Sequence, residues 1–254
     1  MDAELAALRL QLGATELSRY AKMKNNHRRF VAFFDMLGMK QAMLRNVDEA
    51  WGALCDINAA KKRIYEIAIE VKDTNQIIKD RVQTFFFSDT VIIFTYSDEP
   101  EDLYSILTLS SELFSNALHR CVPLRGAIAH GKFYFNLEEY LFLGKPLITA
   151  YKLGEACQWL GIVVDDSVAK MAEKLAINEI IIQWNVPLKK NKVQRLYVIN
   201  WPWIFRNNFT IRPISLEAFY RAFEPLFGPF NELPEKAKIK YKNTVTFINS
   251  ILDN

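Results

Sequence analysis

The stretch Phe30-Val31-Ala32-Phe33-Phe34-Asp35-Met36-Leu37-Gly38 decides how we expect this chain to fold. Five apolar residues, three of them aromatic, lead to a single acid, and a glycine follows three residues later. A run this short and this rich in aromatic side chains is typical of a buried strand rather than a helix. We therefore expect Asp35 at the end of a strand and Gly38 in the turn before a helix.

Outward from this strand, the pattern of apolar residues predicts helices and strands in alternation. Two apolar runs, Val82–Phe87 and Val91–Phe94, are joined by Ser88-Asp89-Thr90, which is typical of a hairpin. We expect helices near Lys40–Val71, 101–120, Pro146–Trp159, Ser167–Leu175, Leu216–Phe227 and Glu235–Leu252. We expect further strands at Leu124–Ala129 with Phe133–Phe135 as its hairpin partner, and at Ile162–Val164, Ile180–Ile182 and Leu196–Ile199. This order predicts an α+β fold with a ferredoxin-like core.

The same pattern divides the chain into three parts. Apolar residues recur every three or four positions between Glu4 and Met23, which predicts an N-terminal helix within residues 1–25. Residues 26–185 are expected to form the core domain. Residues 186–254 are expected to form a C-terminal strand and helical extension.

Composition and charge narrow the classes of function. Half of the 254 residues are hydrophobic and the net charge is only +3, which is ordinary for a globular protein. The short run Lys189-Lys190-Asn191-Lys192 is interpreted as a solvated loop, so we expect no nucleic-acid binding. Three widely spaced cysteines suggest neither a zinc site nor a disulfide framework. An acidic N-terminus and the lack of a membrane-length apolar run predict a soluble, cytoplasmic protein without membrane contact.

Two acids occupy special positions in the expected layout. Asp35 ends the first strand and Asp89 lies in the turn of the hairpin, 54 residues away (89 − 35). In a ferredoxin-like sheet these strands are neighbours, so the two carboxylates can converge. Paired carboxylates are oxygen ligands suited to Mg²⁺ or Mn²⁺, which in turn bind substrate phosphates. The alternative is that each acid only caps a strand end or a turn.

The turn after Asp35 suits a phosphate group. Met36-Leu37-Gly38-Met39 joins a strand to a helix, where backbone N–H groups and the helix dipole attract anions. Glycine lets the backbone approach phosphate oxygens closely. This turn is not a Walker loop, because no Gly-Lys-Ser or Gly-Lys-Thr follows.

Four motifs in this order resemble those of class III nucleotidyl cyclases. They are Phe33-Phe34-Asp35-Met36-Leu37-Gly38, Ser88-Asp89, the strand Leu124–Gly131 with Arg125, and the segment Gly144–Leu153, together covering roughly residues 28–160. The resemblance implies that residues 26–185 form a cyclase catalytic domain. It also implies a homodimer with active sites shared between the two subunits.

The resemblance also implies residue roles. Asp35, Met36 and Asp89 would hold two Mn²⁺ or Mg²⁺ ions per site, and the turn Met36–Met39, through the amides around Leu37 and Gly38, would bind the triphosphate. Arg125 would support the triphosphate, because its guanidinium suits phosphate geometry. The alternative for Arg125 is a strand-end ion pair.

The chain departs from the family pattern at four positions. The family's transition-state asparagine falls on Ile148 and its arginine on Lys152, which can still act as a point cation. The alternative for Lys152 is a solvated helix lysine. The two positions that read adenine fall on Phe85 and Leu141, and neither can hydrogen-bond to a purine.

A branch of the family lacks the purine-reading residues in the same way. Asp35–Gly38, Phe87–Thr90, Arg125–Ile128 and Ala150-Tyr151-x-Leu153 resemble the bacterial Pycsar pyrimidine cyclases. This resemblance implies a uridylate cyclase that converts UTP, with CTP as the alternative substrate. Its cyclic product would act in anti-phage defence through a downstream cyclic-nucleotide-binding effector. Phe85 would then lie beside the smaller base, unless it is a core residue of its strand.

Three other classes of function stay open. An inactive, nucleotide-binding regulatory member of the same fold is suggested by Ile148. A diguanylate-cyclase-type enzyme is disfavoured, because no Gly-Gly-Asp/Glu-Glu-Phe stretch occurs. A structural α+β protein would use Asp35 and Asp89 as turn residues only. His130 is interpreted as a surface histidine rather than a base.

Overall fold

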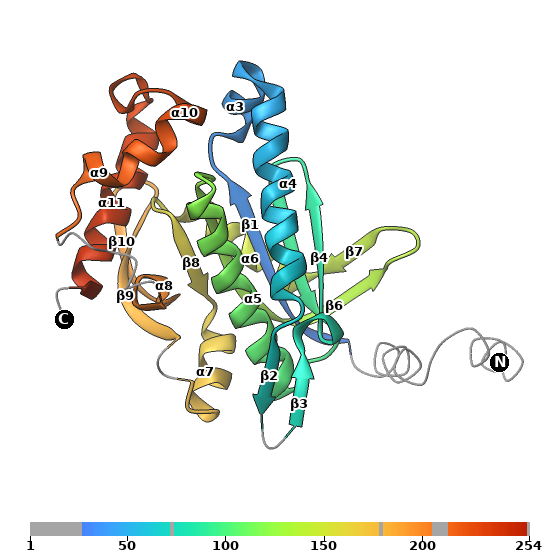
Figure 1. Cartoon of the computed structure of the whole chain (residues 1–254). Coiled ribbons are helices and arrows are strands. Elements are labelled where there is room, and N and C mark those ends of the chain that lie inside the picture. The colour runs from blue at the N-terminus through green and yellow to red at the C-terminus, as the bar shows by residue number, and fades with distance from the viewer. Residues whose placement is uncertain (1–26, 72–73, 178–179, 205–212, 253–254) are drawn as a thin grey trace, which may run out of the picture.

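The computed structural model describes residues 27–71, 74–177, 180–204 and 213–252 (Figure 1). The helix predicted between Glu4 and Met23 lies outside these residues. The main sheet contains β1 (Arg28–Met36), β4 (Val82–Phe87), β5 (Thr90–Thr95), β6 (Leu124–Asn136), β8 (Gly161–Val164), β9 (Ile181–Leu188) and β10 (Lys192–Ile199), with β7 (Leu141–Gly144) paired to β6. A separate small sheet pairs β2 (Ala68–Val71) with β3 (Thr74–Ile77).

The order of the strands confirms the predicted α+β class with a ferredoxin-like core. The sheet runs β4-β5-β1-β6-β8-β10-β9, and adjacent strands among the first four are antiparallel to one another. In chain order these four are second, third, first and fourth, which is the ferredoxin-like arrangement. β1 lies in the middle, and Phe30, Ala32 and Phe34 are fully buried.

Helices cover both faces of this sheet (Figure 1). α4 (Val47–Ile64) and α5 (Pro100–His119) pack against one another across one face. α6 (Lys145–Ala156) packs on β1 and β6, where Tyr151 meets Phe33 with ring centroids 5.2 Å apart. Since side chains alternate along a strand, Asp35 shares the face of Phe33. Within the residues that the structure describes, no helix is long and apolar enough to cross a membrane.

The single helix predicted at Lys40–Val71 is wrong. The segment forms two helices, α3 (Met39–Arg45) and α4, which are separated at Asn46. The backbone of Asn46 is extended, and its side chain accepts hydrogen bonds from the N–H groups of Asp48 and Glu49. A side chain that satisfies the first N–H groups of a helix begins a new one there. The last four residues, Ala68–Val71, form β2 instead.

The hairpin predicted between Leu124–Ala129 and Phe133–Phe135 is also wrong. β6 continues through both segments, because β1 pairs with it as far as Arg28 opposite Lys132. The partner of its far end is β7, with Phe133 opposite Gly144. The turn follows Asn136, whose side chain accepts hydrogen bonds from two N–H groups of that turn. Asn thus sets the hairpin several residues later than expected.

The C-terminal region continues the main sheet. β9 and β10 form a hairpin in the same sheet as β1, so the predicted boundary between residues 185 and 186 falls within β9. Lys190 and Asn191 have positive φ in the hairpin turn, consistent with the predicted solvated loop. The helices that follow are α8 (Trp201–Ile204), α9 (Leu216–Tyr220), α10 (Glu224–Phe227) and α11 (Glu235–Leu252). The helix predicted over Leu216–Phe227 is therefore two helices, joined by a 3₁₀ turn at Arg221–Phe223.

α11 is fixed to the core by polar and aromatic contacts. The Thr244 hydroxyl accepts a hydrogen bond of 2.8 Å from the Leu160 N–H, and the Asn243 amide donates one of 2.6 Å to the Gln158 carbonyl. Phe247 packs edge-on against Trp159, with centroids 4.7 Å apart. The last helix is therefore attached directly to the segment between α6 and β8. The remaining core helix, α7 (Asp166–Lys174), follows β8.

Candidate functional site

The fold brings Asp35 and Asp89 to adjoining strand ends. Asp35 pairs with Thr90 across the β1–β5 ladder. Asp89 immediately precedes Thr90, in the turn between β4 and β5. The Met36 N–H donates a 2.7 Å hydrogen bond to the Asp89 carbonyl, which ties that turn to the end of β1. The predicted adjacency of these two strand ends is thus present. The role of the two acids as metal ligands stays a prediction.

Met36 can offer only its backbone to a metal ion. Its side chain is buried, and a thioether is a poor ligand for Mg²⁺ or Mn²⁺. In an antiparallel ladder, the N–H and C=O of one residue point to the same neighbouring strand. The Met36 N–H is bonded to Asp89, so the Met36 carbonyl is the one polar group that this residue has left to offer.

Oxygen ligands of the kinds that these residues carry suit a hard divalent cation. Two carboxylates and one carbonyl match the ligands that Mg²⁺ uses when phosphate and water complete its shell. Within the described ranges, no cluster of three or more His, Cys, Asp or Glu side chains arises anywhere that could hold a metal. Any ion at Asp35 and Asp89 therefore depends on the backbone, water or substrate for its remaining ligands.

Arg125 is fixed on Asp35. The two residues are paired in the β1–β6 ladder, and the Arg125 Nε and Nη2 atoms lie 2.9 and 2.8 Å from Asp35 Oδ2. Arg125 Nη1 donates to the carbonyls of Glu155 and Cys157 at the end of α6, at 3.0 and 3.2 Å. The Arg125 side chain is only 9% exposed. The alternative of a strand-end ion pair thus describes what Arg125 does here, and its contact with a triphosphate stays a prediction.

The glycine turn after β1 is less open than its sequence suggests. The Leu37 N–H donates a 2.8 Å hydrogen bond to the Pro123 carbonyl, so this amide is occupied rather than available to a phosphate. Gly38 has φ +76° and starts α3 without a side-chain cap. A Cβ on Gly38 would lie 3.1 Å from the Phe227 ring. The C-terminal extension therefore covers this turn.

α6 presents its exposed side to solvent at the predicted transition-state positions. Ile148 is 53% exposed, and Lys152 is exposed one turn later. This exposure agrees with the alternative of a solvated helix lysine. A role for Lys152 toward a site on a second subunit stays a prediction.

Phe85 belongs to an aromatic cluster rather than to an open pocket. Its ring stacks on Phe94 at 5.9 Å and lies 4.7 Å from Phe142. These rings fill the space between the sheet and the β6–β7 hairpin. The alternative given for Phe85, a core residue of its strand, fits this packing. Leu141, the other expected base-reading position, is exposed on β7.

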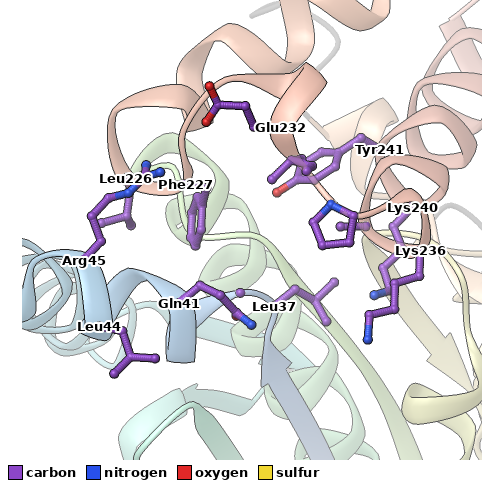
Figure 2. Close-up of a pocket in the computed structure, with 14 residues that line it drawn as sticks. Leu37, Gln41, Leu44, Arg45, Leu226, Phe227, Glu232, Lys236, Lys240 and Tyr241 are labelled. Atoms are coloured by element: carbon purple, nitrogen blue, oxygen red, sulfur yellow. The ribbon is translucent and has the colours of Figure 1, made fainter.

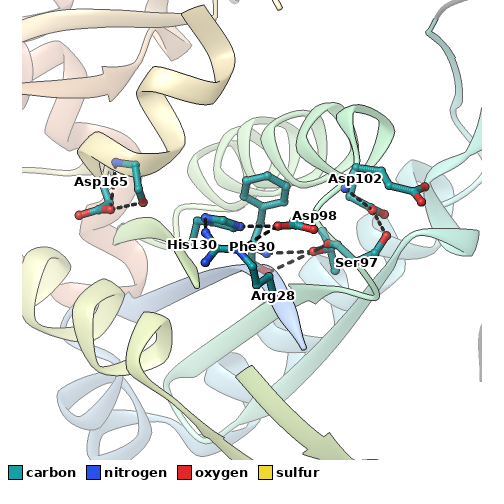
Figure 3. Close-up of polar contacts among 10 residues, drawn as sticks. Arg28, Phe30, Ser97, Asp98, Asp102, His130 and Asp165 are labelled. Carbon is teal, nitrogen blue, oxygen red and sulfur yellow. Dashed lines mark hydrogen bonds and ion pairs between the residues drawn. The ribbon is translucent and has the colours of Figure 1, made fainter. Parts of the chain in front are cut away.

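The interpretation of His130 as a surface residue is wrong. Its side chain is 3% exposed, and its Nε2 lies 3.0 Å from Asp98 Oδ2, which also pairs with Arg28 (Figure 3). Burial lowers the pKa of His130, while the hydrogen bond to Asp98 opposes this shift. His130 pairs with Phe30, five residues or about 17 Å along β1 from Asp35. It therefore stabilises the far end of the sheet.

A pocket of about 530 Å³ lies between α3 and the C-terminal extension (Figure 2). Its lining includes Leu37 and Gly38 from the turn after Asp35, and Lys236 and Lys240 from α11. Sequence reasoning missed these lysines. Their spacing of four residues on a predicted helix was the available signal, because it places both on one face.

Comparison with known proteins gives structural neighbours only. No protein-family model matches this chain, and no curated protein matches it. The catalytic core of a rhodopsin-guanylyl cyclase with converted specificity, in complex with ATPalphaS, is similar at a TM-score of 0.47 and 14% identity, covering 68% of this chain and 95% of that one. Two structures of a bacterial light-regulated adenylyl cyclase are similar at TM-scores of 0.44, with 12% and 14% identity and 68% of this chain covered.

The present chain spans about half the length of those two adenylyl cyclase chains, 51% and 52%. Likenesses with TM-scores below 0.5 do not identify a function. Evidence for the function of this chain therefore comes from the geometry around Asp35 and from the sequence motifs.

Proposed function

We propose that this protein is a nucleotidyl cyclase that converts a nucleoside triphosphate into a 3′,5′-cyclic monophosphate and pyrophosphate. The observation that carries the proposal is the position of two acids, from distant parts of the chain, at adjoining strand ends. Asp35 is the second-last residue of β1, and the Asp89 carbonyl accepts a 2.7 Å hydrogen bond from the N–H of Met36, the last residue of that strand. Both lie within motifs that resemble those of class III nucleotidyl cyclases.

The reaction needs positioning more than covalent participation by the protein. The ribose 3′-oxygen forms a bond to the α-phosphorus as the bond to the bridging oxygen breaks. That oxygen keeps the electron pair and departs with pyrophosphate, and the 3′-hydroxyl proton passes to solvent. Asp35 and Asp89 orient the reacting groups, and Arg125 fixes the Asp35 carboxylate in one orientation.

Asp35, Asp89 and the Met36 carbonyl would hold Mn²⁺ or Mg²⁺. Bound there, divalent ions supply positive charge that activates the 3′-oxygen and stabilises the triphosphate. Arg125 contacts only Oδ2 of Asp35 in the described structure, which leaves Oδ1 for a cation. The donor set therefore fits the proposed ions.

The proposed substrate is a pyrimidine nucleoside triphosphate, UTP ahead of CTP. Phe85 and Leu141 stand where purine-reading polar residues occur in the resembling family, and neither can hydrogen-bond to adenine. The resemblance to Pycsar cyclases supports the same assignment. With it come the proposals of a bacterial anti-phage role, a cyclic-nucleotide-binding effector downstream and a cytoplasmic location.

The active form is proposed to be a homodimer. Large apolar side chains of β7 and α6 are exposed together: Leu141 is 62%, Leu143 71%, Ile148 53% and Tyr151 45% exposed. Clustered exposed apolar groups favour a protein–protein contact. Lys152 lies on the same helix and would reach the site of the second subunit.

Product analysis tests the enzyme proposal. Purified protein is incubated with each of the four ribonucleoside triphosphates and Mn²⁺, and the products are identified by mass. We expect cyclic UMP as the main product, lost in Asp35→Ala and Asp89→Ala and kept in Asp48→Ala, an exposed acid of α4. No cyclic product from any substrate would refute the cyclase proposal, whereas cyclic AMP as the main product would refute only the pyrimidine assignment.

A second candidate is an inactive nucleotide-binding protein of the same fold. The observation that favours it is Ile148, an exposed apolar side chain where the resembling family has a hydrogen-bonding asparagine. Binding of UTP without turnover in the same assay would select this alternative.

A further inference from the structure

The pocket between α3 and the C-terminal extension joins three separate segments. Leu37 and Gln41 line its base, Leu226 and Phe227 form one wall, and α11 forms the other (Figure 2). Gly38 is also among the lining residues. Its volume of about 530 Å³ lies in the range of small-molecule sites. Because Leu37 and Gly38 come two and three residues after Asp35, the pocket opens beside the proposed metal-binding end of β1.

The charged lining residues favour an anion. Arg45, Lys236 and Lys240 contribute three positive charges, and Glu232 is the one acid among the described lining residues, giving a net charge of +2. Figure 2 shows Lys236 and Lys240 side by side on α11, with Glu232 at the opposite edge of the pocket. The two lysines therefore form a local positive end.

Lys240 lacks full solvation. It is partly buried, and burial lowers its pKa to about 8; repulsion from Arg125 acts in the same direction, and attraction to Asp35 acts against it. These interactions place the Lys240 ammonium within electrostatic reach of the Asp35–Arg125 pair. A cation held away from water gains most from an anion bound nearby.

We propose that this pocket binds the polyphosphate tail of the substrate, with Lys240 and Lys236 as phosphate-binding residues supplied by the C-terminal extension. This assignment rests on the proposed cyclase function. The α-phosphate lies at Asp35 and Asp89, and the β- and γ-phosphates extend past Leu37 into the pocket toward α11. The lysines then stabilise the charge that develops on pyrophosphate as it leaves.

The apolar walls support this occupant. Phe227 lies over Gly38, and Tyr241 is 6% exposed beside Lys240. Such walls limit water around the bound phosphates and so strengthen their interaction with the lysines. The site is thereby completed by residues about 200 positions after Asp35 in the chain, which sequence comparison of the four motifs does not reach.

Binding of inorganic tripolyphosphate tests the pocket without requiring turnover. Calorimetric titrations of the full chain are made with and without Mn²⁺. We expect Lys240→Met and Lys236→Met each to weaken binding about tenfold, and Lys240→Arg to keep most of it. Methionine retains an apolar stem, which keeps the packing of α11. Lys242→Met is the matched control, because Lys242 lies exposed on α11 outside the pocket lining.

Each outcome decides the proposal. Tripolyphosphate binding that fails in both conditions, or that is equal in wild type and both methionine variants, overturns it. Should Lys240→Met unfold, the exposed Lys236 carries the test alone. In an active enzyme, the methionine variants should lower kcat/KM for the nucleotide about tenfold, and an unchanged kcat/KM overturns the assignment.

Failure of the proposed function gives a different result. If the wild-type protein makes no cyclic product but binds tripolyphosphate through Lys240, the pocket proposal stands and the cyclase proposal fails. If the protein cyclises nucleotides with no contribution from either lysine, the cyclase proposal stands and the pocket proposal fails.

Discussion

Two nitrogen atoms of Arg125 contact the same oxygen of Asp35, Oδ2, with Nε at 2.9 Å and Nη2 at 2.8 Å. Neither contact involves Asp35 Oδ1. Its Nη1 is held by two carbonyls at the end of α6. The orientation of the Asp35 carboxylate thus depends on Arg125, 90 positions later in the chain, and on the position of α6, which holds Arg125. Changes at either partner should therefore affect both stability and turnover.

Asp35 and Asp89 should differ in their effect on stability although both should be needed for activity. Asp35→Asn leaves the buried Arg125 charge without its partner and should destabilise the protein by about 1–3 kcal/mol. Among the described residues, no hydrogen bond or ion pair involves the Asp89 side chain, so Asp89→Asn should change stability by less than about 0.5 kcal/mol. Urea denaturation measures both. Equal effects would contradict the pairing.

Arg125→Lys should weaken the protein despite keeping the charge. Lysine can approach Asp35 but cannot also donate to the Glu155 and Cys157 carbonyls, so we expect a loss of about 2 kcal/mol and a fall in turnover. Arg195→Lys is the matched control, since Arg195 makes one exposed contact with Gln183. A control as unstable as the Arg125 variant would show that the two carbonyl contacts are unimportant.

A series of Gly→Ala variants should report how closely β1 and α6 pack against β6. A Cβ on Gly126 would lie 2.5 Å from the Phe33 carbonyl oxygen, whereas one on Gly154 would lie 3.2 Å from Gly126. We expect losses of about 3 and about 1 kcal/mol. Gly52, in α4, has nothing within 4 Å, and its variant should gain about 0.5–1 kcal/mol. Thermal unfolding checks this order, and a reversal of it would contradict the packing.

Asp102 should make stability depend on pH. Burial raises the pKa of Asp102 to about 6, while hydrogen bonds from Ser97 and Glu99 and the charge of Arg81 act against this shift. The pKa of an aspartate in an unfolded chain is about 3.9. Between about pH 4 and pH 6, Asp102 therefore binds more protons in the folded state than in the unfolded state. The contribution of Asp102 to stability is therefore complete below about pH 4 and is lost as the pH rises through about 6.

Asp102→Asn measures this contribution, because an amide does not titrate. The stability of the variant relative to wild type should rise by at most about 3 kcal/mol between about pH 4 and pH 7. A difference between the two proteins that stays constant over this range would contradict the raised pKa.

The exposed apolar patch should control self-association. Leu143→Asp places a charge among exposed apolar side chains of β7 and α6, and it should weaken dimer formation by at least about tenfold and reduce turnover with it. Val193→Asp is the control, because Val193 is similarly exposed, at 66%, on β10. Sedimentation at several concentrations measures both. A monomeric wild-type protein with full activity would contradict the dimer.

The main sheet was predictable where strand and turn signals agree locally. The aromatic run before Asp35 and the Ser88-Asp89 turn each specify their element without help from the rest of the chain. Asn46 and Asn136 mark two of the places where prediction failed. Each asparagine side chain binds backbone N–H groups ahead of it and so starts a helix or a turn inside a segment whose apolar pattern continues.

The site was predictable only in part for a different reason. The placement of Asp35 beside Asp89 follows from strand order, which the sequence indicates. The hydrogen bond from Leu37 to Pro123 and the cover that Phe227 places on Gly38 depend on long-range packing. No local pattern encodes such contacts, so the contribution of the C-terminal extension emerged only from the structure.

Lys240 follows Gly38 by 202 positions (240 − 38). A ribosome produces the chain from its amino end, so the strands bearing Asp35, Asp89 and Arg125 emerge well before α11 exists. A nascent polypeptide acquires the lysine-bearing wall of its pocket late, and one terminated early never acquires it. Because of this order of synthesis, the proposed phosphate-binding pocket can form only after most of the main sheet has been made.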